Sequence, residues 1–114
     1  MKGRELTEAQ LKRQIEDYLD ILQNQCKIVW LRLNAGDNFR PGKEGKLYRV
    51  KGCPKGTSDL CIIKDGKAIF VELKSYKGKV TPEQYSFAER VQACGAQWYV
   101  VKLFQELEDI LGVL

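Results

Sequence analysis

Two carboxylates and a lysine lie close together in the stretch 56–74, GTSDLCIIKDGKAIFVELK, where Asp59 precedes one apolar run and Glu72 and Lys74 end the next. Carboxylate oxygens are ligands that Mg²⁺ and Mn²⁺ prefer, and Mg²⁺ often uses only one or two carboxylates. A metal held in this way lowers the pKa of water and stabilises charge on a phosphate. A lysine beside it can position or activate that water. The residue types are therefore compatible with a metal site that hydrolyses a phosphate ester.

The turn between the two apolar runs determines where the carboxylates lie. Asp65-Gly66 predicts a two-residue type I′ turn that joins strands 60–64 and 67–74. Such a turn fixes the register of the hairpin, and in this register Asp59 faces Glu72. Side chains opposed in this way have Cβ atoms roughly 4.5–5.5 Å apart, and two carboxylates repel each other by up to about 1 kcal/mol. A divalent cation between them removes this conflict.

The same register assigns the two faces of the hairpin. Lys74 shares the face of the two carboxylates, and the backbone carbonyl of Leu73 is a further candidate ligand. The opposite face is expected to be core and carries Leu60, Ile62, Ile69, Val71 and Leu73. An alternative interpretation needs no metal: Glu72 and Lys74 form a surface ion pair on an edge strand, and Asp59 is a turn residue. The spacing alone leaves both interpretations open.

Apolar spacing and capping residues predict the elements that surround the hairpin. Thr7 with Gln10, and Thr81 with Gln84, form capping-box patterns at the start of two helices, and Gly95 stops the second helix. The loop 35–47 carries three glycines and one proline and is expected to be mobile unless something binds it. The other predicted elements are helix 7–25, strand 27–33, a short strand 48–51, strand 96–103 and helix 104–114.

Length and composition are those of an ordinary globular protein. The 114 residues predict one domain, 1–114, and the four separated cysteines without any histidine argue against zinc and for reduced thiols in a cytosolic protein. No apolar run is long enough to span a membrane, and the first residues do not resemble a signal peptide.

The net charge of +4 is concentrated in one region. Residues 40–55 contain a single acid, Glu44, and a larger set of basic residues, namely Arg40, Lys43, Lys46, Arg49, Lys51 and Lys55. Such a basic, glycine-rich segment is either a surface that contacts the phosphates of nucleic acid or a solvated loop.

The motifs together resemble the VRR-NUC domain, the virus-type replication-repair nuclease of the PD-(D/E)XK superfamily. The resemblance covers nearly the whole chain and rests on Glu8, Arg32, Asn34, the segment Lys55-Gly56-Thr57-Ser58-Asp59, Glu72-Leu73-Lys74, Gln84 and Gly95. Ser58 departs from the proline that the family more often has. The resemblance implies a restriction-endonuclease-like α/β fold, with a mixed central β-sheet flanked by helices.

The resemblance also implies roles for individual residues. Asp59 and Glu72 would hold Mg²⁺ or Mn²⁺, Lys74 would assist the attacking water, and Gln84 would orient the water or the phosphate. Glu8 would be the helical acid of the site, with Glu16 as its rival. Gln84 has the alternative role of a helix cap, and Glu8 that of an acid at the positive end of a helix dipole.

The implied substrate is DNA. Arg32 and Asn34 are expected to contact DNA, or else to fix the end of a strand, and the basic segment 40–55 is expected to grip it. Phage-type members of such a family resemble resolving enzymes for four-way (Holliday) junctions in DNA repair, which are homodimers because two symmetric nicks need two active sites. The expected location is the cytoplasm of a bacterium or phage host. The alternatives are a nuclease for linear or single-stranded ends and a non-catalytic nucleic-acid-binding subunit.

Overall fold

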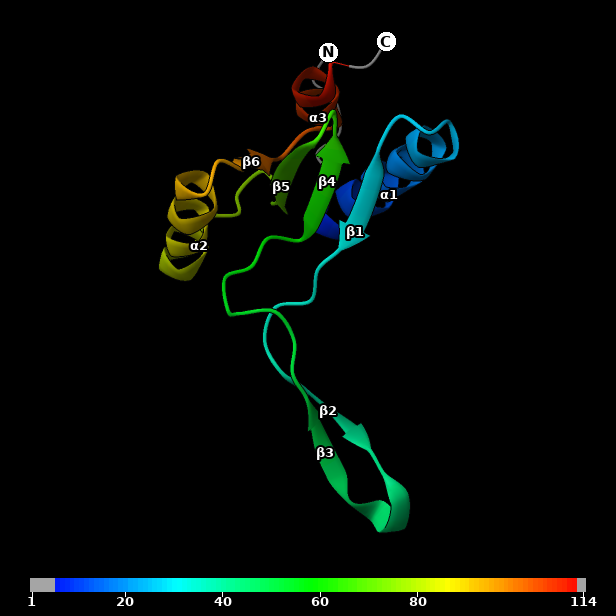
Figure 1. The fold of residues 1–114 in the computed structure, drawn as a ribbon, viewed down its shortest axis with the longest axis vertical. Helices are drawn as coiled ribbons and strands as arrows, with labels where there is room; N and C mark the ends of the chain where they lie inside the picture. Colours follow the sequence, from blue (N-terminus) through cyan, green and yellow to red (C-terminus); the bar gives the residue numbers. More distant parts are fainter. Residues whose placement is uncertain (1–5, 113–114) are drawn as a thin grey trace.

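The computed structural model describes residues 6–112, which form a mixed α/β fold around a four-stranded sheet (Figure 1). The strand order is β1-β4-β5-β6; β1, β4 and β5 are antiparallel, and β6 runs parallel to β5. The bounds are α1 Glu8–Asn24, β1 Val29–Arg32, β4 Leu60–Lys64, β5 Lys67–Leu73, α2 Pro82–Ala93, β6 Gln97–Val101 and α3 Phe104–Leu111. The predicted fold class, a mixed central sheet flanked by helices, is confirmed.

The central hairpin β4–β5 has the predicted turn and register. Asp65 and Gly66 have positive φ angles of 51° and 75°, as a type I′ turn requires. The ladder runs from Lys64 opposite Lys67 to Leu60 opposite Val71, so the next position along both strands sets Asp59 against Glu72.

Helices cover both faces of the sheet. The predicted core face of the hairpin is buried against α1 and α3, and this core includes Leu11, Ile15, Leu19, Leu60, Ile62, Val71, Leu73, Leu107 and Leu111. On the opposite face, α2 packs across β5 and β6, with the rings of Phe87 and Phe70 edge to face at 5.3 Å. The face that carries Glu72 is therefore also covered by protein, which removes its carboxylate from water.

The ends of the helices follow the predicted caps. Capping boxes are present at Thr7 and Thr81, and α2 ends just before Gly95, which has a φ of +90°. Gly112 in the left-handed conformation ends α3 earlier than predicted, at Leu111. The last two residues of the predicted helix 104–114 lie outside the described residues. Within residues 6–112, no helix is long and apolar enough to cross a membrane.

The prediction of an irregular loop at 35–47 is wrong, because the segment contains a strand and a 3₁₀ turn. Strands β2 (Asn38–Pro41) and β3 (Leu47–Val50) pair as a separate two-stranded sheet that projects away from the body, with a short 3₁₀ turn at Lys43–Gly45 near its tip (Figure 1). We call residues 34–58, the whole excursion between β1 and β4, the arm. The glycines and the proline of this segment are typical of a loop. No alternation of apolar and polar residues indicated strands instead, because neither β2 nor β3 has a buried face.

The arm is narrow where it leaves the body. Its two legs approach each other so closely that a Cβ atom at Gly52 would lie 1.9 Å from the carbonyl oxygen of Gly36. The Gly36 N–H donates to the Cys53 carbonyl at 2.7 Å, and the Cys53 N–H donates to the Asn34 carbonyl at 2.8 Å. We call these residues, 34–36 and 52–53, the neck, and their hydrogen bonds fix the direction in which the arm points.

Candidate active site

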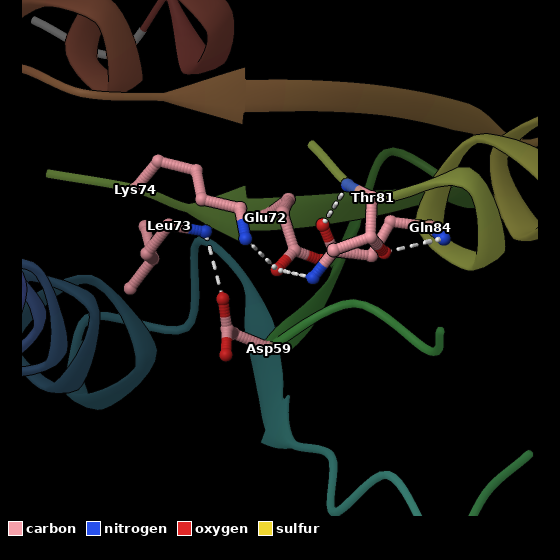
Figure 2. Close-up of polar contacts among 6 residues, drawn as sticks. All are labelled: Asp59, Glu72, Leu73, Lys74, Thr81 and Gln84. Carbon is pink, nitrogen blue, oxygen red and sulfur yellow. Dashed lines mark hydrogen bonds and ion pairs between the residues drawn. The ribbon is translucent and has the colours of Figure 1, made fainter. Parts of the chain in front are cut away.

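Asp59 lies at the point where the arm returns to the sheet. Its backbone carbonyl accepts a hydrogen bond from the Leu33 N–H at 2.9 Å, and its side-chain Oδ2 accepts one from the Leu73 N–H at 2.8 Å (Figure 2). The second bond crosses from the start of β4 to the end of β5. It holds the Asp59 carboxylate beside Glu72, as the hairpin register predicted.

Glu72 is a buried acid, with only 3% of its surface exposed. Its Oε1 accepts a hydrogen bond from the Gln84 side-chain amide at 2.8 Å and lies 3.8 Å from the Lys74 Nζ (Figure 2). Its Oε2 is buried and has no hydrogen-bond partner among residues 6–112. A buried carboxylate oxygen without a partner is costly, so this atom is the strongest indication of a missing ligand.

The surroundings of Glu72 oppose its ionisation. Burial, followed by the charge of Asp59, raises the pKa of Glu72 to about 8, and the nearby ammonium of Lys74 acts in the opposite direction. A carboxyl with this pKa is largely protonated at neutral pH unless a cation binds it. The pair therefore has the electrostatics of a cation site.

Gln84 caps α2, which is one of the two roles that the sequence suggested for it, and it also contacts Glu72. Its Oε1 accepts the Thr81 N–H at 2.9 Å as part of the capping box of α2, and its Nε2 donates to Glu72 (Figure 2). The two ends of one amide thus join the start of α2 to the acidic pair. The helix cap is what aims the amide at Glu72.

Lys74 follows directly after β5 and is 13% exposed at its side chain. Its backbone N–H donates to the Val101 carbonyl at 3.1 Å, which continues the pairing with β6 beyond the end of β5. This bond places the lysine on the face predicted for it, with the ammonium next to Glu72.

The two candidates for the helical acid have different surroundings. Both Glu16 carboxylate oxygens accept hydrogen bonds from the Arg32 guanidinium, at 2.6 and 3.0 Å. Glu8 is exposed at the start of α1, and its charge adds a small contribution to the raised pKa of Glu72. Glu8 remains the proposed acid of the site, because Glu16 is already neutralised by Arg32.

The donor set of the site fits a hard divalent cation. Within the described part of the chain, no group of three or more His, Cys, Asp or Glu side chains could hold a metal. The set is thus the Asp59 and Glu72 carboxylates, with the Leu73 carbonyl as a proposed third oxygen. Mg²⁺ usually keeps several waters and takes one or two carboxylates, so the unpartnered Glu72 Oε2 suits it.

The residues predicted to contact DNA do not gather at the acidic pair. Arg32 lies at the end of β1, bound to Glu16, and Asn34 belongs to the neck. The others lie along the arm and are all exposed, namely Arg40, Lys43, Lys46, Arg49, Lys51 and Lys55. Sequence reasoning missed the neck, whose glycines Gly36 and Gly52 resemble ordinary loop glycines until their close approach is known.

The mixed sheet flanked by helices, with an acidic pair and a lysine where strands end, is an architecture of nuclease-type proteins. The family model of the VRR-NUC domain matches residues 7–104, and the chain belongs to this family. Membership indicates a nuclease-type function with DNA as the partner. Comparison with curated proteins gave no match, and comparison with solved structures gave none either.

Proposed function

We propose that the protein is a metal-dependent DNA endonuclease that hydrolyses phosphodiester bonds at the Asp59–Glu72 pair. The observation that carries the proposal is the buried, unpartnered Oε2 of Glu72, next to a second carboxylate and a lysine. A structural hairpin gains nothing from this arrangement, because Glu72 is buried beside a second carboxylate and is held protonated at a cost in free energy. A divalent cation turns the same arrangement into a favourable one.

Each side chain of the site has a separate proposed role. When bound, Mg²⁺ or Mn²⁺ supplies positive charge that polarises the phosphate and lowers the pKa of water. Gln84 occupies Glu72 Oε1 and leaves Oε2 for the metal, while the Leu73 N–H holds Asp59 in place. Lys74 positions the attacking water and offsets charge on the phosphate.

The proposed substrate is branched DNA, such as a four-way junction, cut by a homodimer in the cytoplasm of a bacterium or phage host. The exposed basic arm supports a DNA substrate, because it offers cations well away from the acidic pair. Two symmetric nicks need two active sites, which a two-fold dimer supplies. Arg32 and Asn34, near the root of the arm, are proposed as further DNA contacts.

The test compares the wild-type protein with Lys74→Ala on labelled linear, flap and four-way DNA, with Mg²⁺, Mn²⁺ or EDTA. We expect metal-dependent cutting of the four-way substrate, and a rate about 100- to 10,000-fold lower for Lys74→Ala. Lys67→Ala is the matched control, because Lys67 is exposed at the far end of β5.

Three outcomes would change the proposal. Equal rates for the wild type and Lys74→Ala contradict the catalytic role of the lysine. Cutting restricted to linear or single-stranded ends replaces the junction substrate by DNA ends. Tight binding without cutting in either metal leaves a nucleic-acid-binding subunit.

A further inference from the structure

The two strands of the arm do not pack against the rest of the described chain. Every residue of β2 and β3 is exposed, including Phe39 at 65%, Leu47 at 69% and Tyr48 at 55%. An isolated two-stranded hairpin is only marginally stable in water. Large apolar side chains displayed together on such an element are typical of an interaction surface.

The charge of the arm identifies the chemistry of the partner. Residues 34–58 contain six Lys and Arg residues against Asp37 and Glu44, so the arm alone carries the whole net charge of +4. The rest of the chain has equal numbers of acidic and basic residues. A polyanion is therefore the complementary partner, and for a member of a nuclease family this is nucleic acid.

The width of the arm favours the major groove of B-form DNA over the other grooves of a nucleic-acid duplex. Paired strands lie about 4.8 Å apart, so a ribbon with its side chains is roughly 10 Å wide. The major groove of B-form DNA, about 12 Å wide, admits a two-stranded ribbon directly, whereas the minor groove, about 6 Å wide, admits one only when the duplex is widened or bent. The major groove of A-form RNA is too deep and narrow for protein to enter.

The register of the ribbon suits a groove bordered by two phosphate strands. Phe39 pairs with Arg49 on one face, and Arg40 pairs with Tyr48 on the other. Each face therefore carries one guanidinium beside one aromatic ring. A cation is available to both walls of the groove, and a ring on each face can lie against base edges.

The root of the arm links this groove contact to the catalytic end of the sheet. The hydrogen bond between Leu33 and Asp59 closes the arm beside the acidic pair, and the neck fixes its direction. From Gly36 in the neck to the tip at Glu44 the chain spans eight residues, which reach at most roughly 26–29 Å at about 3.3–3.6 Å per residue. This length is within one turn of B-form DNA, about 34–36 Å.

We propose that the arm lies in the major groove of the B-form DNA duplex that flanks the cleaved bond, within about one helical turn of it. The inference rests on the proposed function for the position of the cut, but the groove contact itself is a matter of binding. It assigns the protein a substrate that needs a duplex arm next to the branch, rather than single strands alone.

The experiment measures binding by fluorescence anisotropy in EDTA, so that no DNA is cut. Four-way substrates carry duplex arms of 6 to 20 base pairs, with or without methylation of guanine N7, an atom in the major groove. The variants are Arg40→Ala/Arg49→Ala and Gly52→Ala, which keeps the charge but disturbs the neck. The control with the same loss of charge is Lys27→Ala/Lys67→Ala, at the far end of the sheet. Thermal melting confirms that each variant folds.

We expect the wild-type affinity to rise until the arms reach about one turn, roughly 10 base pairs, and then to level off. N7 methylation should weaken wild-type binding at least about 5-fold, while a ligand that fills the minor groove and a duplex RNA competitor have little effect. The Arg40→Ala/Arg49→Ala variant should lose about 10-fold or more in affinity. Both arm variants should lose the dependence on length and methylation, and the control should keep it.

The proposal is overturned if N7 methylation has no effect, if the minor-groove ligand displaces the protein, or if duplex RNA competes equally. It is also overturned if the arm variants convert a dimer into a monomer in sedimentation, since the arm would then contact a second copy of the chain. Binding that is sensitive to methylation, together with a complete absence of cutting, would contradict the proposed nuclease and leave the groove contact standing.

Discussion

Glu72 keeps only 3% of its surface exposed within the sheet, whereas every residue of β2 and β3 in the arm is exposed to solvent. The acidic pair has fixed partners, with Asp59 held by the Leu73 N–H and Glu72 by Gln84. Few ion pairs hold the basic groups of the arm: Arg49 lies 3.5 Å from Asp37, and Lys55 lies 3.7 Å from Glu83. The acidic pair is thus rigid and buried, as a catalytic site requires, whereas the arm is exposed and available to bind a partner.

A metal site and a phosphate-binding surface differ in how much they lower the stability of the free protein. A metal site needs charges held rigidly out of water, and these lower the stability of the metal-free protein. A phosphate-binding surface needs mobile cations in water, which cost almost nothing in the free protein. Changes at the acidic pair should therefore alter both chemistry and stability, and changes on the exposed strands of the arm should alter binding alone.

The largest effect is expected for Glu72→Gln. Glutamine keeps the acceptor for Gln84 but cannot carry the charge, so we expect cleavage to fall about 100- to 1,000-fold. The same change removes a buried ionisable group and should stabilise the metal-free protein by at least about 1 kcal/mol at pH 8. Cleavage rates and urea melts measure the two effects, with the exposed Glu89→Gln as control. If Glu72→Gln lowered stability as well as activity, the statement that the buried carboxyl of Glu72 costs stability would be wrong.

The second effect concerns pH and metal. The pKa of Glu72 is about 8 in the folded protein against an ordinary value of 4.5, so the folded state binds more protons between these values. The stability of the metal-free protein should therefore fall as pH rises from about 5 to 8, by on the order of 2–4 kcal/mol.

Divalent metal should reverse this dependence, because Mg²⁺ or Mn²⁺ binds the ionised carboxylates and stabilises the folded protein more at pH 8 than at pH 5.5. Thermal melts across this range, with and without metal, test both statements. The chain has no histidine to obscure the titration. Glu72→Gln should flatten the metal-free curve, and an unchanged slope in that variant would assign the titration to another group.

The third effect is confined to the arm. Lys43→Ala/Lys46→Ala, near its tip, should lower DNA affinity about 10-fold at low salt and reduce the slope of log K against log salt by up to about 2. The cleavage rate at saturating DNA and the melting temperature should not change. Lys27→Ala/Lys67→Ala removes the same charge from the far end of the sheet and should leave the slope unchanged. A lower rate at saturating DNA would show that the two regions are not separable.

The smallest effect compares two neighbouring hydroxyl groups at the end of the arm, where it meets β4. The Ser58 hydroxyl is fully buried and has no partner, while the Thr57 hydroxyl donates to the Pro54 carbonyl at 2.5 Å. Ser58→Ala should stabilise the protein by up to about 1 kcal/mol, and Thr57→Val should destabilise it by about 1 kcal/mol. Urea melts distinguish the two. Destabilisation by Ser58→Ala would indicate a partner for that hydroxyl.

The hairpin could be predicted from the sequence because its turn is local. Two residues, Asp65 and Gly66, set the register, and the register sets which side chains share a face. The turn alone is therefore enough to predict that Asp59, Glu72 and Lys74 share one face. The bond from Gln84 to Glu72 could be expected only from the family resemblance, because the helix that carries Gln84 packs on the sheet through tertiary contacts.

Of the arm, only the short strand at 48–51, which overlaps β3, was predicted, because the strands of the arm bury nothing. Alternation of apolar and polar residues arises when one face of a strand is packed, and β2 and β3 have no packed face. The pairing of Arg32 with Glu16 was missed for a different reason. The two residues are brought together only when α1 packs beside β1, a long-range arrangement that no local pattern specifies.

The hydrogen bond between the Leu33 N–H and the Asp59 carbonyl joins the two ends of the arm at the edge of the sheet, so the segment beyond it can vary in length. The two residues remain paired whatever length of chain joins them, and doubling a loop costs only about 0.6 kcal/mol in closure entropy. Insertions, deletions or replacements within 37–51, beyond the neck, should thus leave the spacing of the two carboxylates unchanged. A new DNA target can then arise in this segment without a change at the acidic pair.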